Sequence, residues 1–199
     1  MGSDGRCRRI RCTGSCVDVR FVETPIAGAF VVEVEPIEDE RGFFARTWDA
    51  SQFDDHGLTS CLAQCSISFS RRKGTLRGMH YQVAPHEEAK LVRCTAGAIF
   101  DALVDLREDS ATYTRSFAVE LTPGNGRQLY VPEGCAHGFL TLADSTEVSY
   151  QISEAYSPGH STGVAWDDPV FAIPWPAEAE VMSERDRSYP PFLPVRSLP

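Results

Sequence analysis

Two residues in the stretch GTLRGMHYQVAPHEEAKLVRC, residues 74–94, could do chemistry. His80 is of a type that takes and returns protons near neutral pH, and Lys90 could hold a negative oxygen that develops in a pocket. Each also has a simpler interpretation. A single strand histidine more often serves packing, and a strand-end lysine commonly pairs with a loop glutamate such as Glu87 or Glu88. Taken alone, the pair leaves a structural and a catalytic role open.

Arg77 precedes His80 by three residues. On a regular strand an odd separation places two side chains on opposite faces, so these two share a face only if Gly78 introduces a bulge. Arg41 in DERGFF also neighbours a glycine, and two guanidinium groups offer forked donors to a diphosphate. The alternative is that both arginines form salt bridges in an acidic chain.

The other candidates are a histidine and two tyrosines. His137 lies in VPEGCAHGFL, where Gly134 and Gly138 would allow a ligand to approach closely. Tyr150 and Tyr156 are, taken alone, ordinary core or rim aromatics. The sequence contains no glycine-rich phosphate loop, no serine nucleophile elbow and no CxxC pair, which removes the commoner nucleotide-binding and hydrolase motifs.

Short apolar segments separated by turn residues must position these side chains. Strands at this spacing predict an all-β sandwich or barrel in a single domain, residues 18–199. One early helix is expected in DASQFDDHG, with Asp49 as N-cap and Gly57 as its end, and the proline-rich tail after WDDP is expected to wrap the body. The predicted strand segments are GAFVVEVEP, CLAQCSISFS, AKLVRCTAGAIFDALVDLR, RSFAVELTPGNGRQLYVP, HGFLTL and TEVSYQIS.

Size and charge exclude several classes of function. The 199 residues, 42% of them hydrophobic, suffice for one core, and the net charge of -9 argues against nucleic acid or anionic membranes as partners. No apolar run approaches the roughly 20 residues of a membrane span, and the N-terminus lacks the apolar segment of a signal peptide. We therefore expect a cytoplasmic protein. Residues 1–17, with three cysteines, are expected to be a disordered extension.

Six motifs occur in the order found in the dTDP-4-dehydrorhamnose 3,5-epimerase family of nucleotide-sugar epimerases. They are DERGFF (39–44), GTLRGMHYQ (74–82), KLVRCTAGAIFDALVDLR (90–107), LYVPEGCAHGF (129–139), SYQISEAYSP (149–158) and WDDP (166–169). The chain resembles this family from about residue 19 to residue 187. The resemblance implies a cupin-type double-stranded β-helix, or jelly roll, with a few short peripheral helices. It also implies a homodimer that works without a metal or redox cofactor.

The resemblance further implies a reaction on a nucleotide-linked 4-keto-6-deoxy hexose. The ketone at carbon 4 acidifies the hydrogens on carbons 3 and 5, because the resulting carbanion delocalises onto oxygen. By similarity, His80 is the base and Asp186 in MSERD orients it. Lys90 matches the residue that stabilises the enolate oxygen, and Tyr150 matches the proton donor on the opposite face. Removing a proton from one face and returning it on the other inverts the carbon.

The same resemblance assigns residues to substrate binding. In the family QCSIS, residues 64–68, reads QDNHS, so Ser66 stands where an amide would face the ligand. Arg46 replaces a glutamate that lies near the nucleotide base in the family. Together these two departures make CDP- and GDP-linked sugars alternatives to a dTDP-linked one. Arg77, and Arg41 supplied by the partner subunit, match the residues that contact the diphosphate. The positions that line the sugar and nucleotide pocket are Phe44, Gln64, His137 and Tyr156, and Arg185 lies near the nucleotide.

Three other functions stand beside the epimerase hypothesis. They are a nucleotide-sugar 3,4-ketoisomerase of the same superfamily, a non-catalytic sugar-nucleotide-binding cupin and a metal-dependent cupin oxygenase. A binding-only pocket has no need for all four catalytic candidates. A cupin metal site uses two histidines separated by one residue, whereas HYQVAPHE spaces His80, His86 and Glu87 differently, so no metal is predicted. The sequence leaves open whether carbon 3, carbon 5 or both are inverted.

Overall fold

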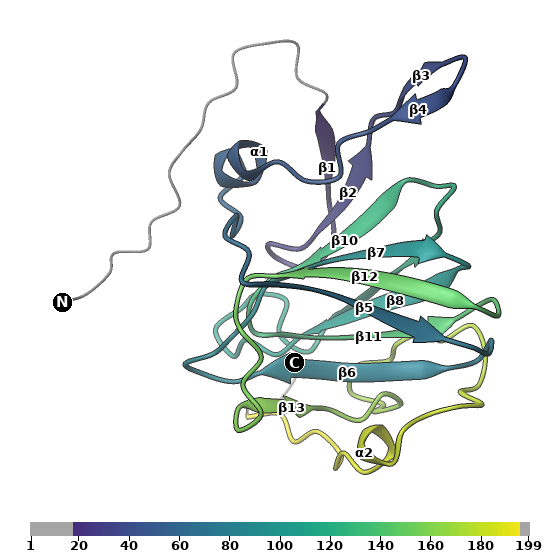
Figure 1. Cartoon of the computed structure of the whole chain (residues 1–199). Coiled ribbons are helices and arrows are strands. Elements are labelled where there is room, and N and C mark those ends of the chain that lie inside the picture. Colours follow the sequence, from purple (N-terminus) through teal and green to yellow (C-terminus); the bar gives the residue numbers. More distant parts are fainter. Residues whose placement is uncertain (1–17, 196–199) are drawn as a thin grey trace.

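Two antiparallel sheets face each other in the computed structural model, which describes residues 18–195 (Figure 1). The six-stranded sheet contains, in spatial order, β1 (Val19–Glu23), β2 (Phe30–Val34), β10 (Arg127–Val131), β7 (Lys90–Ala96), β12 (Thr146–Ile152) and β5 (Gln64–Ser70). The five-stranded sheet contains β13 (Ser161–Gly163), β6 (Leu76–Gln82), β11 (Cys135–Thr141), β8 (Ile99–Asp105) and β9 (Ser116–Leu121). The predicted all-β jelly roll is confirmed.

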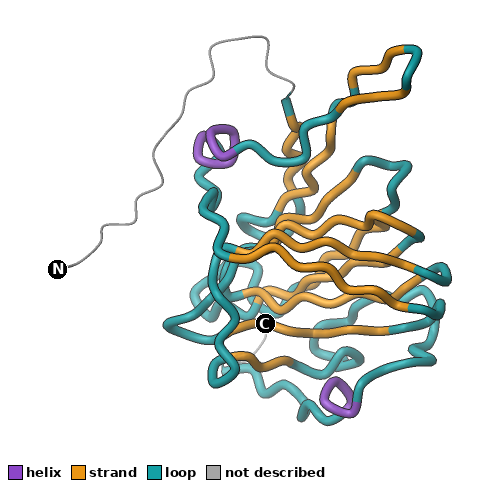
Figure 2. Tube along the Cα trace, in the orientation of Figure 1, coloured by secondary structure: helices purple, strands orange, loops and turns teal. Residues whose placement is uncertain are grey.

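Strands account for most of the regular structure, and the predicted apolar segments all form strands (Figure 2). The predicted early helix is α1 (Ala50–Asp55), where the Asp49 side chain accepts from the backbone N–H groups of Ser51 and Gln52. Gly57 follows with a φ of 69°, which favours glycine and ends the helix. The sequence prediction missed β1, β13, the hairpin of β3 (Ile37–Asp39) and β4 (Gly42–Phe44), and α2 (Glu184–Arg187).

The main core lies between the two sheets, where alternating residues of facing strands meet. Val92, Leu129 and Val148 come from the six-stranded sheet and pack with Leu103 and Phe139 of the five-stranded sheet, all nearly inaccessible. This core fills the middle of the sandwich because the inward residues there are apolar. Polar residues replace apolar ones where β5, β6, β7, β11 and β12 line a cavity between the sheets.

Both sheets also bury part of their outer faces. Phe53 of α1 packs on Leu91 and Tyr130 over one half of the six-stranded sheet. On the five-stranded sheet, Met79 and Val104 are covered by a cluster that includes Phe171, from the chain that follows β13. In the chain, α2 lies between Phe171 and Phe192 of this second cluster, and it carries one of the predicted catalytic residues.

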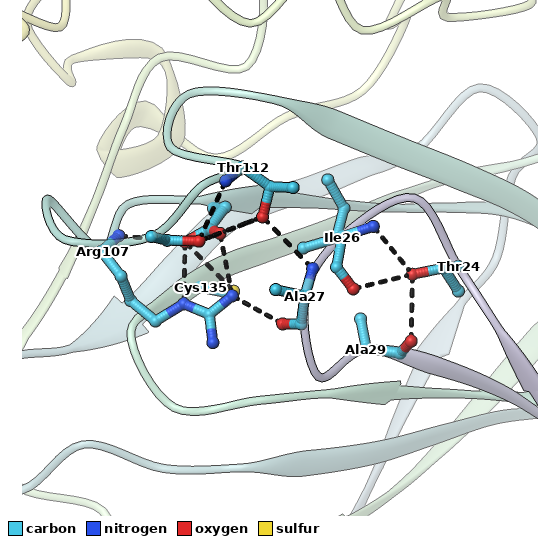
Figure 3. Close-up of polar contacts among 9 residues, drawn as sticks. Thr24, Ile26, Ala27, Ala29, Arg107, Thr112 and Cys135 are labelled. Atoms are coloured by element: carbon cyan, nitrogen blue, oxygen red, sulfur yellow. Dashed lines mark hydrogen bonds and ion pairs between the residues drawn. The ribbon is translucent and has the colours of Figure 1, made fainter.

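A buried aspartate joins the turn between β1 and β2 to the end of β8 (Figure 3). Asp105 accepts from the Arg107 side chain at 2.8 Å, and Thr112 Oγ1 donates to it at 2.6 Å. Arg107 Nη2 also donates to the Ala27 backbone oxygen at 2.7 Å, and Thr112 Oγ1 accepts from the Ala27 backbone nitrogen at 3.2 Å. These bonds hold the turn against the sandwich.

Two further predictions from the sequence concern membrane-spanning segments and the N-terminal extension. No helix within residues 18–195 is long and apolar enough to cross a membrane. The predicted N-terminal extension, residues 1–17, lies outside the described residues.

Candidate active site

A cavity of about 300 Å³ lies between the two sheets. Strands β5, β7 and β12 supply one wall and β6 and β11 the other, so side chains far apart in sequence meet there. Asp186 lies behind the wall and bonds one of the lining residues. The predicted residues that line the cavity are His80, Tyr150, Lys90, Gln64, Ser66, Arg77, His137, Tyr156 and Arg185.

His80 and Asp186 form a hydrogen-bonded pair although 106 residues separate them. His80 Nε2 lies 2.7 Å from Asp186 Oδ1, and Asp186 is buried at 5% exposure. Ser183 caps the start of α2 by accepting from the Asp186 backbone N–H at 3.1 Å, which holds the backbone of this residue. Burial raises the pKa of the Asp186 carboxyl and the hydrogen bond to His80 lowers it, and the net pKa lies below the ordinary value. The pair suits a histidine that gains a positive charge during a reaction.

Arg77 and His80 both line the cavity because β6 contains a bulge. His80 pairs with His137 and Arg77 pairs with Phe139, so three steps along β6 match two along β11. The Gly78 backbone has a φ of 145°, and a Cβ there would lie 2.5 Å from the Gly138 Cα. The bulge that the sequence left conditional is therefore present. Gly138 serves this close approach of two strands rather than the approach of a ligand.

Lys90 begins β7 and points into the cavity beside His80. Its Nζ donates to Glu88 Oε1 at 2.8 Å and to the His80 backbone oxygen at 3.3 Å. The pairing with a loop glutamate, which sequence reasoning treated as the structural alternative, is thus present within the cavity itself. An ammonium so placed can stabilise a negative oxygen that forms near His80.

Tyr150 lines the cavity from β12, on the sheet opposite His80. Its hydroxyl lies 3.2 Å from Ser68 Oγ, and burial raises its pKa above the ordinary value. A neutral phenol is a proton donor, so the arrangement places a possible acid on one wall and a possible base on the other.

Alternate residues of β5 orient three of the predicted groups. Gln64 Oε1 accepts from the Tyr156 backbone nitrogen at 2.9 Å, so this amide positions the loop that carries Tyr156. Ser68 contacts Tyr150, and Ser70 Oγ accepts from Arg77 Nε at 3.2 Å. Because side chains alternate between the two faces of β5, Gln64, Ser66, Ser68 and Ser70 all lie on the side that faces the cavity.

His137 forms a second histidine–aspartate pair, which sequence reasoning missed. Its Nε2 lies 2.8 Å from Asp101 Oδ1, and Asp101 is completely buried. Burial raises the pKa of the Asp101 carboxyl, although His137 and Lys90 act in the opposite direction. The sequence signal was available, because Asp101 interrupts the apolar run AIFDALVDL. The sequence named Glu88 only as a possible structural partner of Lys90, and its place in the cavity lining was not predicted.

Arg41, Phe44 and Arg46, which the resemblance placed near the substrate, do not line the cavity of this chain. Arg41 and Phe44 belong to the β3–β4 hairpin, which projects from the sandwich (Figure 1). Arg41 pairs with Asp39, and Phe44 is 62% exposed. Arg46 Nη1 bonds the α1 N-cap Asp49 at 2.7 Å. Within one chain the two arginines thus pair with nearby aspartates, and Phe44 pairs with Ile37 across the hairpin.

Within residues 18–195, no group of three or more His, Cys, Asp or Glu side chains is arranged to hold a metal ion. His80 and His137 are cross-strand neighbours, but each Nε2 faces its own aspartate.

The chain matches the family model described as dTDP-4-dehydrorhamnose 3,5-epimerase over residues 23–193. A Methanothermobacter thermautotrophicus protein named dTDP-4-dehydrorhamnose 3,5-epimerase is 42% identical over 178 residues, which cover 88% of this chain and 95% of the relative. The Bacillus anthracis enzyme of the same name, solved with TDP and PPi bound, has a TM-score of 0.84 and 39% identity. That match covers 88% of this chain and 100% of the solved chain.

A third relative was solved with a sugar nucleotide. The Legionella pneumophila dTDP-6-deoxy-D-glucose-3,5-epimerase, in complex with dTDP-4-keto-L-rhamnose, has a TM-score of 0.81 and 34% identity, covering 86% of this chain and 92% of its own. Sequence motifs, sandwich topology and these matches agree along nearly the whole described chain. The chain belongs to the dTDP-4-dehydrorhamnose 3,5-epimerase family.

Proposed function

We propose that this protein inverts carbon 3, carbon 5 or both of a nucleotide-linked 4-keto-6-deoxy hexose through an enolate. The observation that carries the proposal is the pair of groups on facing walls: His80 with Asp186 on one sheet, and Tyr150 on the other. A single base would return the proton to the face it came from. Groups on both sides of the sugar ring are what inversion requires.

The hydrogen bonds indicate which atoms act. His80 Nε2 is bonded to Asp186, so Nδ1 is the nitrogen left to take the proton from the carbon next to the ketone. The electron pair of the broken C–H bond moves to the ketone oxygen, where Lys90 stabilises the charge. Tyr150 then gives its proton to the carbon from the opposite face, and proton exchange with water resets both groups.

Deuterium incorporation tests this reaction directly. Proton NMR in deuterated water, with a dTDP-linked 4-keto-6-deoxy hexose, reports which carbon exchanges and which inverts. H80A should abolish exchange at both carbons with the fold intact, and normal exchange in that variant would contradict the assignment. Y150F should reduce inversion more than exchange, because abstraction needs only the base.

We also infer a homodimer in which the β3–β4 hairpin reaches the partner's cavity. Support comes from exposed apolar side chains on the hairpin, where Phe43 and Phe44 are 64% and 62% exposed, and on the outer face of β5, where Ile67 and Phe69 are 68% and 50% exposed. In such a dimer Arg41 would complete the diphosphate site beside Arg77.

Mixing two inactive variants tests the shared site. If Arg41 acts in the partner's cavity, a heterodimer of H80A and R41A chains contains one intact site. Statistical mixing should then restore about one quarter of wild-type activity, since half of the dimers are mixed and each has one working site. A mixture as inactive as its components would refute the shared site, and light scattering would report the dimer itself.

We propose dTDP as the nucleotide, because the Bacillus anthracis and Legionella pneumophila relatives were solved with TDP or a dTDP sugar. Ser66 and Arg46 are the positions at which the chain departs from the family pattern, so CDP and GDP are the alternatives to measure. Titration with dTDP, CDP and GDP should give the tightest binding for dTDP. Tighter binding of CDP or GDP would assign a different base.

A further inference from the structure

Lys90 is held by two acceptors inside the cavity. Its Nζ donates to Glu88 Oε1 at 2.8 Å and to the His80 backbone oxygen at 3.3 Å. The side chains of Lys90 and Glu88 are only 12% and 6% exposed, so the protein rather than water determines where the ammonium lies. An ammonium has three N–H donors, which leaves one donor for an oxygen of the substrate.

The carboxylate of Glu88 bonds nothing else in the described part of the chain. Its Oε2 is buried and has no hydrogen-bond partner among the residues that the structure describes. Burying a carboxylate costs free energy unless it is paired and hydrogen-bonded, and a carboxylate that served stability alone would gain from further donors, as Asp105 does. Holding Lys90 is therefore the role that the contacts of Glu88 support.

The second acceptor of Lys90 belongs to His80, the proposed base. The imidazole of His80 bonds Asp186, while the backbone oxygen of the same residue accepts from Lys90. One residue of β6 thus fixes the distance between the group that takes a proton and the group that receives negative charge. With only this carbonyl, the flexible lysine stem could still swing, and Glu88 supplies the opposing contact that prevents it.

We propose that Glu88 is a positioning residue that aims the remaining donor of Lys90 at the ketone oxygen on carbon 4 of the substrate. The inference rests on the proposed function. Glu88 also balances the charge of Lys90 before the enolate forms. When the enolate oxygen develops, the ammonium is already in place and needs no reorganisation, which is the condition under which electrostatic stabilisation is most effective.

Three single variants separate positioning from binding. Proton NMR in deuterated water gives kcat and KM for exchange with a dTDP-linked 4-keto-6-deoxy hexose. We expect E88A to lower kcat about 100-fold, as misplacement of a reacting group by about 1 Å does, and to leave KM within about threefold. E88Q keeps an acceptor oxygen for Lys90 and should stay within about tenfold of wild-type kcat. K90M gives the loss expected when the donor itself is gone.

The decisive measurement is the double variant E88A/K90M. If Glu88 acts through Lys90, removing it from a protein that lacks Lys90 lowers kcat by less than about threefold further. E154Q is the matched control, because Glu154 lines the same cavity but bonds His86 at 3.2 Å instead of Lys90. Whatever E154Q does to kcat, it should do equally in the wild-type and K90M backgrounds.

Independent, multiplicative losses for E88A and K90M would overturn the inference, as would an effect of E88A on KM alone. Circular dichroism checks each fold, and if E88A does not fold, E88M and E88M/K90M make the same comparison with the side-chain volume largely kept. Wild-type protein that catalyses no exchange would refute the proposed function itself. Exchange in the wild type together with multiplicative losses would refute only the role of Glu88.

Discussion

Asp101 and Asp105 lie four residues apart on the same face of β8, and both are completely buried. Asp105 accepts from the backbone and side chain of Arg107, from Ser110 and from Thr112, and Cys135 lies at 4.0 Å. Among residues 18–195, Asp101 has one hydrogen-bond partner, His137, and its Oδ2 has none. The same residue type on one strand thus meets two very different environments.

The pKa of each carboxyl follows its donors. Burial raises the pKa of both, but at Asp105 the hydrogen bonds from Arg107, Ser110 and Thr112 outweigh burial and the net pKa is lowered. At Asp101 burial dominates and the net pKa is raised. A carboxylate saturated with donors stabilises the fold, whereas one left undersatisfied beside a cavity is held there at a cost in stability and is available for chemistry.

The largest expected effect is on stability, at Asp105, the carboxylate with several hydrogen-bond donors. D105N keeps the side-chain shape but removes the charge that Arg107 and two hydroxyl groups contact. Its free energy of unfolding should fall by about 3 to 5 kcal/mol, because a buried charged network loses one partner. Urea unfolding followed by fluorescence measures this change. A loss below about 1 kcal/mol would show that the network does not stabilise the fold.

D101N should show the reverse balance between activity and stability. Its amide oxygen can still accept from His137, so the free energy of unfolding should change by less than about 1 kcal/mol. An amide beside His137 can neither take up nor release a proton, so kcat for exchange should fall by about tenfold to a hundredfold. Asp101 would count as structural instead if stability fell as far as in D105N while kcat held.

The pH dependence of stability should separate the two aspartates by sign. The pKa of Asp105 is lowered on folding, so its stabilisation is present above an unfolded pKa of about 3.9 and is lost as the pH falls through the folded value. The destabilisation of D105N should therefore shrink from pH 6 to pH 3. The pKa of Asp101 is raised, so its contribution is present below about pH 3.9 and is lost as the pH rises through the folded value.

D101N should consequently gain stability relative to wild type as the pH rises from 3 to 6. Urea unfolding of wild type and both variants at these two pH values checks the signs. Shifts of the same sign in both variants would remove the distinction between the two carboxylates.

The smallest expected effect tests one donor of the saturated network. Thr112 Oγ1 donates to Asp105 at 2.6 Å and accepts from the Ala27 backbone at 3.2 Å. T112V, of similar shape, should cost about 1 to 2 kcal/mol in thermal or urea unfolding. T95V at an exposed position of β7 is the control and should stay within about 0.5 kcal/mol of wild type. Equal values for the two variants would argue against the network as a source of stability.

Local sequence patterns were sufficient for most of the fold. Alternation in FAVELT and TEVSYQIS predicted β9 and β12, and the Asp49 and Gly57 signals predicted α1. These features depend on residues within a few positions of one another, which is why they can be read from the chain. Strands β3, β4 and β13 have three residues each, too few for a periodic signal, and were missed; β1, with five residues, was missed as well.

The ordered motifs of the sequence identified the catalytic candidates, whereas strand register and packing determined their geometry. His80, Lys90 and Tyr150 were named from the sequence, and all three line one cavity. The sequence could not decide whether Arg77 shares that cavity, because the answer depends on a bulge relative to β11. It also gave Arg41 and Phe44 to the site, although in a single chain their hairpin projects away from it.

The sequence by itself determined the strand pattern, the family and the residue types that could move a proton. Only the tertiary structure decided which charges face one another where the sequence left a choice: Glu88 rather than Glu87 against Lys90, and Asp101 rather than Asp105 beside the cavity. The physical reason is that a charge is stabilised by the donors that surround it in space. Strand register, a bulge and the docking of α2 bring those donors together from distant parts of the chain.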